Sequence, residues 1–133
     1  MTQADGLIGQ SLQVSLTAKD LLKSVAWYVD LLGFTEERRY EREGQLRGVV
    51  LTAGDVRILV NQDDGARGWT RVKGEGFSLQ INTRQRVDEV ADRIRKGGGT
   101  LDTEPQDMPW GVRAFRVRDL DGYRWSISMP IAS

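Results

Sequence analysis

The sequence contains no histidine and no cysteine among its 133 residues. Histidine is the usual proton-transferring side chain near neutral pH and the commonest nitrogen ligand of transition metals. Its absence therefore excludes histidine-based acid–base catalysis and every histidine-containing metal site. The absence of cysteine excludes a disulfide framework and a thiol nucleophile. The chemistry left to this chain depends on carboxylates, amines, guanidinium groups, hydroxyls, amides and aromatic rings.

The sequence also lacks an excess of charge and any long apolar run. Lysine and arginine together number 19, as do aspartate and glutamate, so the formal net charge is zero. Nucleic-acid binding normally needs a basic patch, and a membrane-spanning helix needs roughly 20 apolar residues. We therefore expect no nucleic-acid partner and no membrane insertion. The N-terminal residues MTQADGLIGQ have no basic segment followed by an apolar one, which favours a cytoplasmic protein.

The first half of the chain predicts one helix and four strands. Residues 11–17 alternate apolar and polar side chains, as a half-buried strand does. Asp20 is a suitable N-cap for a helix that runs to Leu31 and that Gly33 ends. Turn residues then separate three further strands, at residues 34–43, 46–52 and 56–61. The predicted order is β-α-β-β-β.

The second half predicts the same order after a long irregular stretch. Residues 62–75 contain glycines and several charges, which indicates a linker or a lid. We predict a strand at residues 77–82, a helix from about Arg86 to Lys96 ended by three glycines, and a short strand near residues 100–103. A hairpin at residues 108–129 completes the set. Its polar face carries Ala114, Arg116, Arg124, Ser126 and Ser128.

The two halves also match in register. Placing Gly33 on Gly98 aligns Val14 with Leu79 and Val25 with Val90. Matching apolar registers are expected of any two β-α-β units, so they leave coincidence open as an explanation. The shared order of all five elements favours a duplication.

Three segments together resemble the vicinal oxygen chelate superfamily, which includes glyoxalases, bleomycin-resistance proteins and ring-cleaving dioxygenases. They are VSLTAKDLLKSVAWYVDLLGF at residues 14–34, VDEVADRIRKGGG at 87–99 and PWGVRAFRVRDLDGYRWSI at 109–127. The resemblance implies an α+β fold in which two tandem βαβββ modules form a curled mixed sheet with a cleft and helices on the convex face. It predicts a single domain over residues 1–133, with module one at about 10–61, a loop at 62–75 and module two at about 76–130.

The resemblance also implies where metal-using relatives place their ligands. Carried over to this chain, those positions are Gln13, Leu59, Gly76 and Ser126. Leucine and glycine side chains cannot bind a metal ion, and glutamine and serine are weak neutral donors. We therefore predict that the metal site of the family is absent and that the protein uses no cofactor.

Candidate ligand contacts come from strand alternation and from two tryptophans near turns. Arg116 is either a solvated edge charge or a guanidinium that binds a carboxylate or phosphate. Trp110 either caps the core or stacks on a planar ligand, and Trp69 contacts a ligand or a partner. Trp125 alternates inward with Ile127 and is predicted to lie in the core. The predicted contacts are Gln13, Ser15, Arg57, Leu59, Trp69, Ser78, Gln80, Trp110, Arg116 and Ser126.

Three functional hypotheses follow from the sequence. The first is a metal-free binding protein of the bleomycin-resistance type, which sequesters a polar or aromatic small molecule without transforming it. The second is an enzyme related to the glyoxalase-like lyases and isomerases or to the dioxygenases, and the third is an interaction domain with a filled cleft. We also expect a homodimer, with the cleft completed either within one chain or between two.

Overall fold

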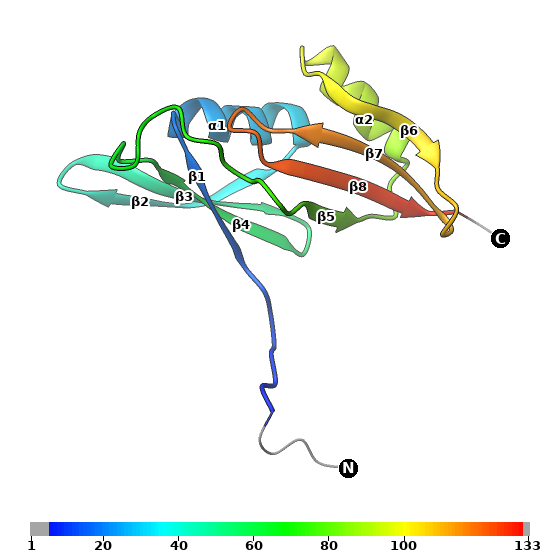
Figure 1. Ribbon diagram of the computed structural model, residues 1–133, viewed down its shortest axis with the longest axis horizontal. Helices are drawn as coiled ribbons and strands as arrows, with labels where there is room; N and C mark the ends of the chain where they lie inside the picture. Colours follow the sequence, from blue (N-terminus) through cyan, green and yellow to red (C-terminus); the bar gives the residue numbers. More distant parts are fainter. Residues whose placement is uncertain (1–5, 132–133) are drawn as a thin grey trace.

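The computed structural model describes residues 6–131, and these form two helical segments and eight strands (Figure 1). The first module contains β1 (Val14–Ala18), α1 (Leu21–Trp27), the π-helical turn η1 (Tyr28–Leu32), β2 (Thr35–Arg42), β3 (Gln45–Ala53) and β4 (Val56–Gln62). The second contains β5 (Leu79–Asn82), α2 (Val87–Lys96), β6 (Leu101–Asp107), β7 (Val112–Arg118) and β8 (Arg124–Pro130). The predicted β-α-β-β-β order is confirmed in both halves. Within the described residues, neither helix is long and apolar enough to cross a bilayer.

The strands form two four-stranded sheets with the same internal order. The first sheet runs β1-β4-β3-β2 and the second β5-β8-β7-β6. In each sheet the first strand pairs in parallel with the fourth, and the other neighbours are antiparallel. The helices lie on one side of the sheets and leave the opposite side open (Figure 1). The predicted α+β class is confirmed, and the curled mixed sheet consists of these two parts.

Local signals place the first helix as the sequence predicts. The Asp20 side chain accepts the Lys23 backbone N–H at 3.2 Å and so caps the N-terminus of α1. Gly33 ends the helical segment with φ of 81°, a left-handed conformation that glycine adopts without steric cost. Leu21 and Val25 are buried, whereas Leu22 is exposed, so not every apolar residue of α1 faces the core.

The core lies between the helices and the sheets. Strand alternation predicts the inward side chains of β4, β7 and β8, and Trp125 is buried as expected. The Tyr28 hydroxyl donates a hydrogen bond to the Asp119 carboxylate and accepts one from Trp125 Nε1 at 2.9 Å. Burial raises the pKa of both the Tyr28 phenol and the Asp119 carboxyl. This network connects the helical segment of the first module to the β7–β8 turn of the second.

The strand boundaries differ most from the predictions at the start of β1 and the end of β6. β1 begins at Val14, so the prediction that Gln13 lies within this strand is wrong. Residues 6–13 instead extend away from the body as an arm (Figure 1), because no strand pairing reaches them. β6 runs to Asp107, well beyond the short strand predicted, because it pairs with β7 through two register shifts that alternation does not show.

The segment between the modules, residues 63–78, is tied to both of them. Lys73 lies inside it, and its side chain is only 5 % exposed. Its Nζ atom lies 2.9 Å from Asp63 Oδ2 at the end of β4 and 3.4 Å from Asp121 Oδ1 in the β7–β8 turn. The Lys19 backbone N–H also donates to Asp121 Oδ1 at 2.8 Å. Of the two predicted roles, linker and lid, these contacts favour an anchored linker.

Candidate functional site

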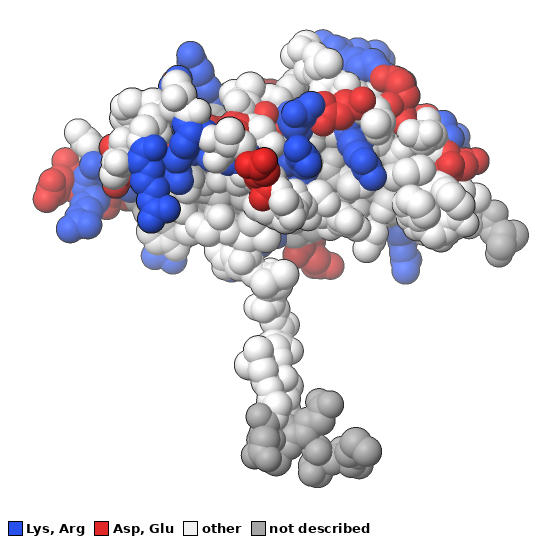
Figure 2. Space-filling view, viewed as in Figure 1, with Lys and Arg blue, Asp and Glu red and all other residues white. Residues whose placement is uncertain are grey.

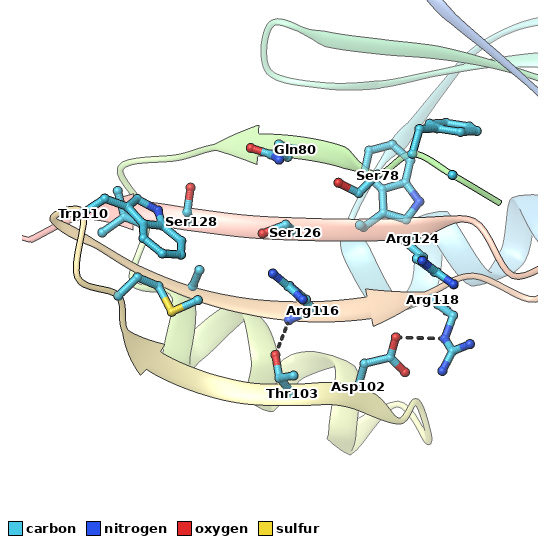
Figure 3. Close-up of a pocket in the computed structure, with 16 residues that line it drawn as sticks. Ser78, Gln80, Asp102, Thr103, Trp110, Arg116, Arg118, Arg124, Ser126 and Ser128 are labelled. Carbon is cyan, nitrogen blue, oxygen red and sulfur yellow. Dashed lines mark hydrogen bonds and ion pairs between the residues drawn. The ribbon is translucent and has the colours of Figure 1, made fainter. Parts of the chain in front are cut away.

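A pocket of about 630 Å³ lies on the open side of the second sheet. β7 and β8 supply most of its surface, residues 76–78 and Gln80 of β5 supply a further part, and the start of β6 supplies one rim. Arg116 and Ser126 lie near its centre (Figure 3), directly opposite each other in the antiparallel β7–β8 pairing. The inward neighbours Phe115 and Ile127 belong to the core, so alternation along both strands directs Arg116 and Ser126 to the open side.

The two ends of the pocket differ in chemistry (Figure 3). Trp110 and Ser128 lie at one end, and Arg118, Arg124 and Asp102 lie at the other. Trp110 is 68 % exposed, so it does not cap the core. It follows Pro109 in a tight turn, closed by a hydrogen bond from the Gly111 N–H to the Met108 carbonyl at 3.2 Å. The turn therefore places Trp110 at the pocket end, where its exposed indole face can stack on a planar group.

The polar groups of the pocket are partly engaged with one another. Arg118 Nε lies 2.8 Å from Asp102 Oδ2, and the Arg116 backbone N–H donates to Thr103 Oγ1 at 3.0 Å. The Ser128 hydroxyl donates to Asn82 Oδ1 at 3.0 Å. The Arg116 and Arg124 guanidinium groups form no ion pair with a carboxylate of residues 6–131.

Ion pairing separates these two arginines from Arg113 on the same strand. Arg113 lies 2.8 Å from Asp88 on α2 and 3.0 Å from Asp107 at the end of β6. Hydrogen bonds from Arg113 lower the pKa of the Asp88 carboxyl. Arg113 therefore ties the helix to the sheet and is not available to a ligand.

The ten predicted contacts fall on different parts of the surface. Ser78, Gln80, Trp110, Arg116 and Ser126 line the pocket together. Gln13 and Arg57 line a separate hollow of about 300 Å³ on the first sheet, where Arg57 is paired with Glu37. Ser15, which accepts a hydrogen bond from Asn61 at 2.7 Å, and Leu59 lie opposite each other on β1 and β4 of the same sheet.

Trp69 lies outside both hollows. Its indole ring covers Gly65, where a Cβ atom would approach the ring to 2.5 Å. Gly65 also has φ of 75°, so the close packing and the backbone conformation both require glycine. The role of Trp69 in binding a ligand or a partner stays a prediction.

Several lining residues were not among the predicted contacts, namely Phe77, Asp102, Thr103, Met108 and Arg118. Arg118 follows Arg116 by two residues, so strand alternation was sufficient to find it. Asp102 and Thr103 gave no such signal, because a register shift between β6 and β7 decides which of them reach the pocket.

The positions implied for a family metal do not form one donor set. Gly76 and Ser126 line the pocket, Gln13 lines the other hollow, and Leu59 offers no ligand atom. No group of three or more aspartate or glutamate side chains within residues 6–131 is arranged to hold a metal ion. The donor chemistry at these positions therefore does not fit a divalent cation.

The duplicated βαβββ modules, with helices on one side and an open surface on the other, define a class of two-module α+β proteins. The chain belongs to the Glyoxalase/Bleomycin resistance protein/Dioxygenase superfamily, whose family model matches residues 10–127. This match confirms the resemblance seen in the sequence.

Similar proteins are found among both solved structures and sequences. The crystal structure of TioX from Micromonospora sp. ML1 is 27% identical and has a TM-score of 0.72, covering 92% of this chain and 100% of that one. A glyoxylase/bleomycin resistance protein/dioxygenase domain from Frankia sp. EAN1pec is 25% identical with a TM-score of 0.73, covering 94% and 93%. An uncharacterized protein of Mycobacterium bovis is 26% identical over 127 residues, which are 91% of this chain and 84% of the relative.

Proposed function

We propose that this protein is a metal-independent small-molecule-binding protein of the bleomycin-resistance type, which holds a polar, partly aromatic ligand without transforming it. The observation that carries the proposal is the open pocket on the second sheet. It combines hydroxyl, amide and guanidinium groups with an exposed tryptophan. Such a mixture of an aromatic surface and a few oriented polar groups is typical of sites that bind small organic molecules.

The acid–base groups of the pocket support binding over catalysis. A general base must be free to accept a proton from the substrate. Asp102, the carboxylate that lines the pocket, already accepts a hydrogen bond from Arg118. The unsuitable donors at the implied metal positions support the metal-independent part of the proposal.

We propose further that the protein works as a homodimer and that a second copy completes the site. The pocket lies on the second sheet alone, whereas the predicted contacts Gln13, Ser15 and Arg57 lie on the first. A cleft formed by the first sheet of one copy and the second sheet of another would bring both sets of side chains to one ligand. Location in the cytoplasm is part of the same proposal.

A ligand panel with a chemical readout tests this function. Thermal-shift screening and titration calorimetry against antibiotics and aromatic metabolites should reveal saturable binding, and mass spectrometry should recover the bound compound unchanged. Elemental analysis of protein prepared without chelators should show no metal whose content correlates with turnover of a ligand. Formation of a product from a bound compound, or turnover that depends on a co-purified metal, would instead identify an enzyme of the superfamily.

A further inference from the structure

We infer that the ligand of this pocket is an aromatic anion, with its acidic group held by Arg116 and Arg124 and its rings lying toward Trp110. This inference rests on the proposed function and specifies the chemical class of the ligand. The acidic group is a carboxylate or a similar anion, which a guanidinium group can bind through two parallel hydrogen bonds.

The first argument is the local charge. Arg116, Arg118 and Arg124 line the pocket together with one carboxylate, Asp102. The pocket therefore carries an excess of two positive charges in a chain whose formal net charge is zero. A concave surface with an excess of charge of one sign attracts ligands of the opposite sign.

The second argument is the position of the charges within the sheet. Arg118 and Arg124 are direct cross-strand partners on β7 and β8. Like charges in directly opposed positions destabilise a sheet. Asp102 compensates Arg118 at 2.8 Å, but no carboxylate of the described residues compensates Arg124. An anionic group bound between Arg124 and Arg116 would remove this repulsion.

The repeat provides an internal comparison. The β3–β4 pairing joins Val50 to Leu59 and Thr52 to Arg57, and the β7–β8 pairing joins Arg116 to Ser126 and Arg118 to Arg124. The first module thus has a valine and a threonine where the second has Arg116 and Arg118. Arg57, which corresponds to Arg124, is paired with Glu37. At these matched strand positions the second module carries three arginines, of which only Arg118 is paired, whereas the first module carries the single, paired Arg57.

The third argument is the distance between the cations and the aromatic end. Val112, close to Trp110 in the sequence, precedes Arg116 by four residues on β7. At the usual rise of a strand this is about 13 Å. The guanidinium group and the indole ring both extend over the pocket between these points (Figure 3). A ligand with its acidic group at one end and its aromatic surface at the other matches this separation.

The experiment compares three probes of one shape that differ in charge. They are biphenyl-4-carboxylate, the neutral biphenyl-4-carboxamide and the cationic biphenyl-4-ylmethylammonium, each titrated into the full-length protein by calorimetry. The carboxylate should bind at least about tenfold more tightly than the amide, because hydrogen bonds to a charged acceptor are roughly twice as strong as neutral ones. The cation should bind most weakly. Added salt should weaken binding of the carboxylate more than binding of the neutral amide.

Two kinds of variant separate the acidic group from the rings. Arg116→Gln and Arg124→Gln should each weaken binding of the carboxylate about tenfold and change the affinity for the amide less than about twofold. Trp110→Leu should weaken all three probes by about fivefold or more and keep the preference for the carboxylate, because stacking does not depend on the charge. Arg47→Gln is the matched control, since Arg47 is an exposed strand arginine outside the pocket.

The possible outcomes distinguish failure of this inference from failure of the proposed function. Equal binding of the three probes, or tighter binding of the amide or the cation, overturns the inference and leaves small-molecule binding intact. An effect of Arg116→Gln on dimer dissociation without any effect on carboxylate binding also overturns it, because the guanidinium would then belong to a subunit contact. Binding of none of the three probes overturns the inference, and the wider ligand panel then decides the proposed function separately.

Discussion

Lys73 shows how one side chain can hold two modules together. A buried ammonium group is tolerated when carboxylates surround it, and here Asp63 directly follows β4 of the first module and Asp121 lies in the β7–β8 turn of the second. A hydrogen bond from the Gly65 N–H and the contact with Lys73 lower the pKa of the Asp63 carboxyl to about 2. The folded protein therefore binds the Asp63 proton more weakly than the unfolded chain does.

This pKa shift predicts a defined loss of stability in acid. Because the folded-state pKa is depressed from its ordinary value of 3.8, the contribution of Asp63 is present above about pH 4 and is lost as the pH falls toward 2. Asp63→Asn should be less stable than the parent protein at pH 7, and the difference should shrink between about pH 5 and pH 2 on the same grounds. Urea unfolding midpoints measured across this range check the prediction.

Asp64→Asn is the control for this experiment. Asp64 accepts the Ala66 N–H in the same loop but forms no ion pair with the described residues. If the two variants lose stability in parallel at every pH, the coupling between Asp63 and Lys73 does not contribute as argued.

At the scale of the element, the segment of residues 63–78 matters because it sets the position of the second module. Gly74 in this segment packs against Tyr123, and a Cβ atom at Gly74 would lie 2.8 Å from Tyr123 Cδ1 and 3.0 Å from its Cα. The Tyr123 hydroxyl in turn accepts the Thr17 backbone N–H at 3.1 Å. The segment thus contacts β1 of the first module through a residue of the second.

Gly74→Ala should destabilise the protein by about 2–4 kcal/mol. The left-handed conformation costs a residue with a Cβ about 1 kcal/mol or more, and forcing an extra carbon against Tyr123 adds about 1–3 kcal/mol. Gly76→Ala is the matched control, because Gly76 also has positive φ but open space around its Cβ position. Gly76→Ala should show the backbone cost alone. Equal losses in urea unfolding for the two variants would disprove the packing contact.

At the scale of the whole molecule, the N-terminal arm is the feature that one copy leaves unexplained. Leu7, Ile8 and Leu12 are 96%, 74% and 90% exposed. Residues 6–13 carry no charge, and the arm stands clear of a body covered with both charge signs (Figure 2). Apolar side chains on a projecting segment are stabilised when they pack on another surface, and the proposed second copy supplies one.

Replacing the apolar residues of the arm should therefore weaken the dimer. The triple variant Leu7→Ser, Ile8→Ser and Leu12→Ser should raise the dimer dissociation constant by at least about tenfold, because burial of even one large apolar side chain contributes roughly 1.5–3 kcal/mol. Sedimentation equilibrium measures this constant. Leu120→Ser, an exposed leucine in the β7–β8 turn, should leave it unchanged. An unaltered dissociation constant in the triple variant would remove the arm from the interface.

The sequence by itself determined the features that depend on local periodicity and on composition. Alternation along the strands, the Asp20 cap and the Gly33 terminus predicted the element order and the core side of β4, β7 and β8, because these signals act over a few residues. The absence of histidine and cysteine limits the available chemistry however the chain folds, because folding adds no side chain that the sequence lacks.

Tertiary structure alone decided which side chains share a site and which charges are compensated. Alternation predicted eight of the ten contacts on one cleft, but these eight divide between two sheets whose relative position no local signal encodes. The pairing of Arg113 with Asp88 and of Arg118 with Asp102 depends on a helix packed against the sheet and on the register shifts of β6. Those long-range contacts leave Arg116 and Arg124 facing the pocket, because ion pairing is set by distance in the folded chain and not by spacing in the sequence.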